Sequence, residues 1–147
     1  VVFRQNPGTT FYIAGRNAPQ FISQIDQPGV VFLGEVEDAY AFMNEKAIMV
    51  VPLLSGSGMR IKIIEGMALG KAIISTSIGA EGIPVNSGEN IIIANDKGQF
   101  VEELNGLLKE EKQCSEMGKK AVSFIKKNFD NLAIASSLLK FYQDQTG

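Results

Sequence analysis

The chain has 147 residues, 45% of them hydrophobic and 20% charged, which is typical of one globular domain or a piece of a larger protein. Its 14 basic and 16 acidic residues leave a net charge of −2, too balanced to indicate a general nucleic-acid-binding surface. Histidine is absent, which excludes Ser-His-Asp and Cys-His catalysis and the usual zinc sites, and the single Cys114 excludes an internal disulfide.

Residues 1–8 are typical of a helix end that runs into a turn, and no initiator methionine precedes them. We therefore expect a fragment whose N-terminal part lies elsewhere. No apolar run reaches the roughly 18 residues that indicate a membrane-spanning helix. Together with the single cysteine, this favours a cytoplasmic location, with association at the cytoplasmic face of a membrane as the alternative.

Short β-rich segments alternate with helical ones along the chain. Strands are predicted at 9–14, 30–33, 47–51, 71–75 and 90–94, and helices at 17–26, 38–46 and 59–69. The rest is predicted helical, with three apolar stripes formed by Val101, Leu104, Leu107 and Leu108, by Cys114, Met117, Ala121, Phe124 and Ile125, and by Leu132, Ala135, Leu138, Leu139 and Tyr142. This alternation predicts an α/β fold with a doubly wound parallel sheet, whose ligands bind at the carboxyl ends of the strands.

A glycine-rich loop at residues 52–60 separates the apolar strand 47–51 from the next helix. Gly56 and Gly58 allow a close approach of the backbone to a ligand, and the start of the helix favours an anion. Arg60 and Lys62 are unfavourable for the dipole at this end of a helix, so their presence predicts a bound phosphate. Glu65, about one turn further on, is placed to accept hydrogen bonds from a ribose diol.

Two known phosphate motifs do not match this segment. Ile61 stands where the dinucleotide fingerprint has its third glycine, and Ala72 replaces the Ser or Thr of a Walker A loop. Structural interpretations stay open for two of the polar residues. Ser57 is equally suited to cap the helix, and Glu65 to be a solvated helix residue.

The same segment resembles the donor-binding region of the GT-B glycosyltransferases of family four, also called group one. Residues 56–62 read Gly-Ser-Gly-Met-Arg-Ile-Lys, as in a subset of that family, and residues 65–74 match its Glu-containing helix. Residues 11–15, 31–38 and 75–82 are similar as well, so the resemblance covers most of the chain from residue 7 to 96. It implies that residues 1–147 are a single nucleotide-sugar-binding domain, the Rossmann-like half of a GT-B fold followed by C-terminal helices.

The resemblance also implies a role for each site residue. Glu65 would bind the ribose, the loop backbone would bind the diphosphate and donor sugar, and Arg60 and Lys62 would act in catalysis by neutralising the leaving diphosphate. The full donor-binding set is Gly15, Arg16, Val36, Gly56, Ser57, Gly58, Met59, Ile64 and Glu65, with the first three beside the base. Neither a metal nor a cofactor is expected, because the nucleoside-diphosphate sugar is a substrate.

Two departures from the family pattern stand out. Ser57 occupies the position, eight residues before Glu65, where the family often has a sugar-binding glutamate. The family's first strand, which is central in its sheet, and the Gly-Arg…Lys segment that belongs with it have no counterpart here. We therefore expect a gap in the sheet.

The predicted function is donor binding in a retaining, hexosyltransferase-type glycosyltransferase that acts on a glycan or lipid-linked acceptor held by an absent N-terminal domain. The isolated chain is expected to bind nucleotide without turnover. The alternatives are a nucleotide-sugar epimerase of related fold and a non-catalytic α/β module, such as a receiver, whose acidic cluster is missing here. The mixed lysines and glutamates of residues 109–127 are interpreted as a solvated face, with peripheral membrane contact as the alternative.

Overall fold

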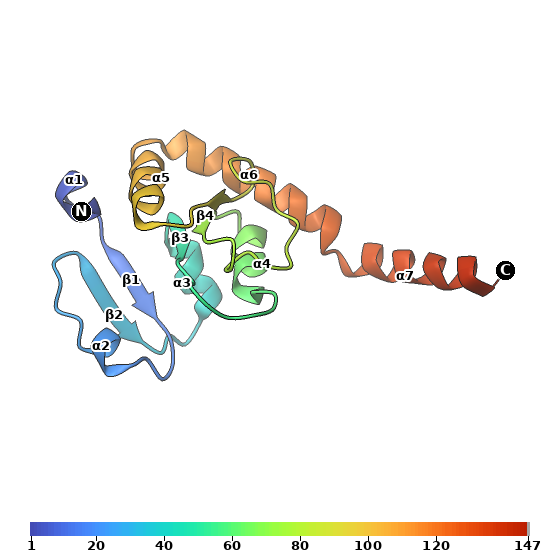
Figure 1. Cartoon of the computed structure of the whole chain (residues 1–147), viewed down its shortest axis with the longest axis horizontal. Coiled ribbons are helices and arrows are strands. Elements are labelled where there is room, and N and C mark those ends of the chain that lie inside the picture. The colour runs from blue at the N-terminus through green and yellow to red at the C-terminus, as the bar shows by residue number, and fades with distance from the viewer. Residues whose placement is uncertain (147) are drawn as a thin grey trace.

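The computed structural model describes residues 1–146, in which helices and strands alternate up to Ser75, a short strand follows at Ile92–Ile93, and helices complete the chain (Figure 1). In chain order the elements are α1 (Val2–Gln5), β1 (Phe11–Ala14), α2 (Gln20–Ser23), β2 (Val30–Gly34), α3 (Ala39–Glu45), β3 (Ile48–Val51), α4 (Ile61–Ala68), β4 (Ala72–Ser75), β5 (Ile92–Ile93), α5 (Lys97–Lys109), α6 (Glu111–Asn128) and α7 (Asn131–Thr146). The helix end and turn predicted for residues 1–8 are confirmed by α1 and the turn after it.

The strands are parallel, but they form two sheets rather than one. β1 pairs with β2, and β3, β4 and β5 form a second sheet in that order. Within residues 1–146, no strand pairs with the second edge of β1 or of β3. The predicted α/β class with parallel strands and flanking helices is therefore confirmed. The division into two sheets agrees with the gap expected for a chain without its central strand.

Helices cover both faces of the three-stranded sheet, as expected for a doubly wound fold. All four residues of β4 are buried, and the side chains of Ala72, Ile73 and Ile74 alternate between two apolar clusters. Ile73 packs with Ile63 and Met67 of α4 and Ala121 of α6. On the other face, Ile74 packs with residues of α5 and α6, among them Leu107 and Met117. The β4 strand is thus the centre of the core.

Three predicted elements are shorter than the sequence pattern indicates. The helix expected from residue 17 is reduced to α2, because Asn17 adopts a left-handed φ of 53° and Pro19 disfavours a helical residue before it. The helix expected from residue 59 begins at Ile61, because Gly58 has a φ of 82° and Arg60 is extended. The strand predicted at 90–94 pairs with β4 only over β5, and Ile91 forms an isolated bridge with Ser87.

The last helix, α7, extends away from both sheets (Figure 1). A helix is confirmed at this position, but its predicted apolar stripe is exposed, with Leu132, Leu138 and Leu139 among the exposed side chains. Among residues 1–146, no helix is both long and apolar enough to cross a membrane.

Candidate functional site

The glycine-rich loop connects the end of β3 to the start of α4. Gly56 and Gly58 have φ angles of 127° and 82°, a left-handed conformation that side chains rarely adopt. Arg60 is the N-cap residue of α4, and no side chain caps the helix. The interpretation of Ser57 as the helix cap is therefore wrong, because the extended residues before Ile61 place the cap three positions later. The first turn of α4 is left without a side-chain acceptor, as a phosphate-binding helix start requires.

The Arg60 side chain folds back against this loop. Its Nη1 donates a hydrogen bond to the Ser57 carbonyl at 2.7 Å, and a Cβ added at Gly56 would meet its Nη2. Its Nε is buried and has no hydrogen-bond partner. A buried guanidinium donor without an acceptor is unfavourable unless an anion binds beside it. The loop and its cation thus form a compact positively charged unit.

Glu65 lies on α4, between Lys62 of the same helix and Tyr40 of α3. The Tyr40 hydroxyl donates to Oε1 at 3.0 Å, and Lys62 Nζ lies 2.6 Å from Oε2. The Lys62 contact is an ion pair without hydrogen-bond alignment, so Oε2 retains unused acceptor capacity. Lys62 lowers the pKa of Glu65; burial opposes this change and Tyr40 assists it. The carboxylate is therefore ionised at neutral pH and held from two sides.

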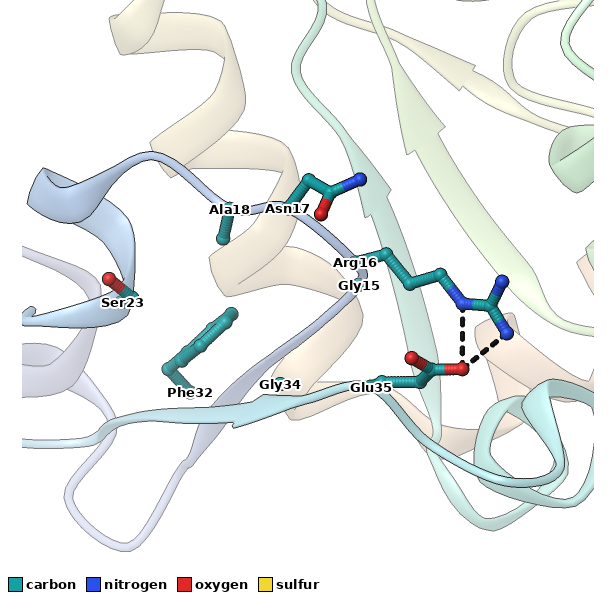
Figure 2. Close-up of a pocket in the computed structure, with 8 residues that line it drawn as sticks. All are labelled: Gly15, Arg16, Asn17, Ala18, Ser23, Phe32, Gly34 and Glu35. Atoms are coloured by element: carbon teal, nitrogen blue, oxygen red, sulfur yellow. Dashed lines mark hydrogen bonds and ion pairs between the residues drawn. The ribbon is translucent and has the colours of Figure 1, made fainter.

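A second part of the site is an open cavity of about 370 Å³ at the carboxyl ends of β1 and β2. Figure 2 shows the residues that line it. Its lining residues are Gly15, Arg16, Asn17, Ala18, Ser23, Phe32, Gly34 and Glu35. Arg16 Nε donates to Glu35 Oε1 at 2.6 Å, and the Gly15 amide donates to the Gly34 carbonyl at 2.7 Å. These bonds join the two strand ends around the cavity.

The structure brings most of the predicted residues into these two groups. Gly15 and Arg16 line the cavity, whereas Val36 follows Glu35 in the chain and is not part of the lining. Met59 lies against Gly82, and Ile64 packs on the apolar cluster beneath α4. The side chain of Ile64 thus packs on the core, whereas the side chains of Lys62 and Glu65 form the ion pair of the site.

Sequence reasoning missed Tyr40, whose hydroxyl contacts Glu65 from the neighbouring helix α3. Asp38 caps α3 by accepting from the amides of Tyr40 at 2.8 Å and Ala41 at 3.0 Å, so Tyr40 lies in the first turn of that helix. The capping pattern was readable from the sequence, but the pairing with Glu65 required the packing of α3 beside α4.

The geometry is suited to an anionic ligand with hydroxyl groups. Positive charge and a helix start surround the loop, a carboxylate lies one turn behind it, and a polar cavity lies at the neighbouring strand ends. Within residues 1–146, no group of three His, Cys, Asp or Glu side chains is placed to hold a metal ion.

Comparisons with known proteins agree with this geometry. The sequence model of the family described as Glycosyl transferases group 1 matches residues 1–110. The chain is 31% identical over 150 residues to the "Uncharacterized 44.6 kDa protein in cps region" of Klebsiella pneumoniae, a match that covers 95% of this chain but 38% of that relative. The chain thus spans well under half of that protein.

Two of the solved structures that are similar to this one illustrate the match. Sucrose-phosphate synthase from Thermosynechococcus elongatus matches with a TM-score of 0.78 and 20% identity, over 99% of this chain and 40% of that one. Anabaena HepE in complex with UDP matches with a TM-score of 0.69 and 17% identity, over 79% of this chain and 32% of that one. At these identities the similarity shows the shared fold.

Proposed function

We propose that this chain is the part of a glycosyltransferase that binds a nucleoside-diphosphate sugar. The proposal starts from the finding that the chain belongs to the group 1 glycosyl transferases. The observation that carries this proposal is the arrangement of Glu65 and Lys62 on α4 directly behind the glycine-rich loop. Family membership favours this function over the epimerase and the non-catalytic module. That HepE was crystallised in complex with UDP supports a nucleoside diphosphate as the ligand class.

Each part of the site has a role in the proposal. Glu65 accepts hydrogen bonds from the ribose, while the loop amides and Arg60 bind the diphosphate. The cavity at Gly15 and Arg16 receives the base. Lys62 is shared, because it pairs with Glu65 before the diphosphate arrives and is long enough to turn toward the new negative charge.

In the transfer itself, the bond between the anomeric carbon and the β-phosphate oxygen breaks, and that oxygen keeps the electron pair. A hydroxyl oxygen of the acceptor bonds to the anomeric carbon, and its proton passes to an oxygen of the departing diphosphate. Arg60 and Lys62 stabilise the charge on the leaving nucleoside diphosphate. We propose that this transfer proceeds with retention to a glycan or lipid-linked acceptor, on the cytoplasmic side, in a longer protein that supplies the acceptor site.

Isothermal titration calorimetry with UDP, GDP, ADP and CDP tests the donor site. We expect at least one of them to bind the wild-type chain, and Glu65→Ala to weaken that binding about tenfold or more, because a charged hydrogen-bond acceptor is lost. Glu103→Ala is the matched control, since it removes an exposed glutamate from α5. Absence of binding by the folded wild type, or equal effects of the two substitutions, contradicts the proposal.

The reaction type needs the full-length protein. Incubation with a donor sugar alone separates a transferase from an epimerase. A transferase leaves the sugar configuration unchanged without an acceptor, whereas recovery of the epimerised donor contradicts the proposed reaction.

A further inference from the structure

We propose that Tyr40 is a positioning residue that holds the Glu65 carboxylate for the two hydroxyl groups of a ribose, a role that rests on the proposed nucleotide site. Tyr40 is outside the set of residues that the family resemblance implies. Its hydroxyl reaches across from α3 to Glu65 Oε1 at 3.0 Å. It therefore fixes the carboxylate from a different helix than the one that carries it.

The position of Tyr40 is set by its own helix. Asp38 Oδ1 accepts the amide hydrogen of Tyr40 at 2.8 Å, which anchors the backbone at the start of α3. The tyrosine side chain has two main torsions, so little conformational freedom is lost when its hydroxyl binds a partner. By contrast, Lys62 has a flexible four-carbon stem, although the two residues are similarly exposed, Tyr40 at 52% and the Lys62 side chain at 59%.

The carboxylate has room for both Tyr40 and a ribose. An ionised carboxylate offers about four acceptor positions, two on each oxygen. Tyr40 uses one position on Oε1, and Lys62 approaches Oε2 without an aligned hydrogen bond. Oε2 is buried beside Lys62, so it becomes available when Lys62 turns to the phosphate. One unused position on each oxygen then matches the paired hydroxyls of a ribose diol.

Tyr40 and Lys62 differ in how they respond to a diphosphate. Lys62 is a cation, so negative charge at the loop attracts it away from Glu65. Tyr40 is neutral, and the neighbouring Glu65 raises its pKa, which keeps the hydroxyl protonated as a donor at neutral pH. Tyr40 therefore continues to hold Glu65 when Lys62 turns to the phosphate.

The test compares Tyr40→Phe with Tyr12→Phe by calorimetry. Tyr12 is the matched control, because its ring lies 4.5 Å from Lys46 Nζ and its hydroxyl is outside the contacts of Glu65. The probes are the tightest-binding of UDP, GDP, ADP and CDP and the 2′,3′-dideoxy form of the same nucleotide. We expect Tyr40→Phe to weaken binding of the ribonucleotide about fivefold to tenfold and to leave the dideoxy form within about twofold of wild type. Tyr12→Phe leaves both unchanged.

Equal losses for both probes, or no loss for the ribonucleotide, overturn the role of Tyr40. If Glu65→Ala still weakens binding in that case, the proposed donor site stands without it. If the wild type binds none of the four nucleotides, both proposals fall. A second measurement, the pKa of Glu65 by NMR, is expected to rise in Tyr40→Phe, and an unchanged pKa contradicts the hydrogen bond on which the role depends.

Discussion

The two sheets of this protein differ in how completely their strands are buried. Every residue of β4 is buried between helices, whereas none of residues 1–62, which include β1 and β2, is fully buried. The proposed nucleotide site lies across both regions: α4 packs on the buried sheet, and the cavity lies on the exposed one. The difference indicates that the proposed site binds the ribose and phosphate groups beside the well-packed sheet. The base binds beside the loosely packed sheet.

Removal of equal apolar volume from the two sheets is the strongest test of this difference. Ile74→Ala in β4 is expected to lower the free energy of unfolding by about 2–5 kcal/mol, because it leaves a cavity in the core. Leu33→Ala in β2, where the side chain is 44% exposed, is expected to cost less than about 1 kcal/mol. Urea denaturation measures both values, and similar losses would refute the difference in packing.

The contact between α4 and α6 is the next test. A Cβ at Gly118 of α6 would collide with the Gly70 carbonyl, so Gly118→Ala is expected to lower the free energy of unfolding by about 1–3 kcal/mol. Gly106→Ala, in α5, meets no atom within 4 Å and is expected to raise it by about 0.5–1 kcal/mol. Thermal unfolding compares the two, and effects of the same sign argue against close packing here.

The pKa of Glu65 on α4, the helix that packs on the buried sheet, is the subject of the next test. Its pKa is lowered in the folded state, so the stabilisation is present above the ordinary value of 4.5 and is lost as the pH falls through the lowered value. Lys62→Met is expected to raise the pKa of Glu65 and to cost about 0.3–0.5 kcal/mol at neutral pH. NMR titration of the carboxyl group follows this pKa, and an unchanged pKa contradicts the ion pair.

The smallest expected change in stability belongs to the exposed ion pair of Arg16 and Glu35, whose side chains are 76% and 55% exposed. Arg16→Ala is expected to change the free energy of unfolding by less than about 0.5 kcal/mol. It is expected to weaken nucleotide binding, whereas Arg4→Ala, on the exposed helix α1, leaves binding unchanged. A large decrease in the free energy of unfolding, or an unchanged affinity for the nucleotide, would contradict the assignment of Arg16 to the nucleotide site.

The sequence was sufficient for the strand–loop–helix arrangement, because glycines and buried apolar runs produce local signals. It was not sufficient for the features that depend on distant pairing. The separation of β1 from β3 depends on which strands meet, and the folding of Arg60 back onto Ser57 depends on the loop conformation. Tyr40 lies in the helix predicted at 38–46, but only the packing of α3 beside α4 places it at Glu65.

The most direct test is a backbone amide NMR titration with a nucleoside diphosphate that binds. We predict that the amides of Gly15 and Gly34 at the cavity and those of Gly58 and Lys62 at the loop shift together, with one common Kd. Shifts confined to one of the two regions, or different affinities for the two, would contradict a single nucleotide site that spans both sheets.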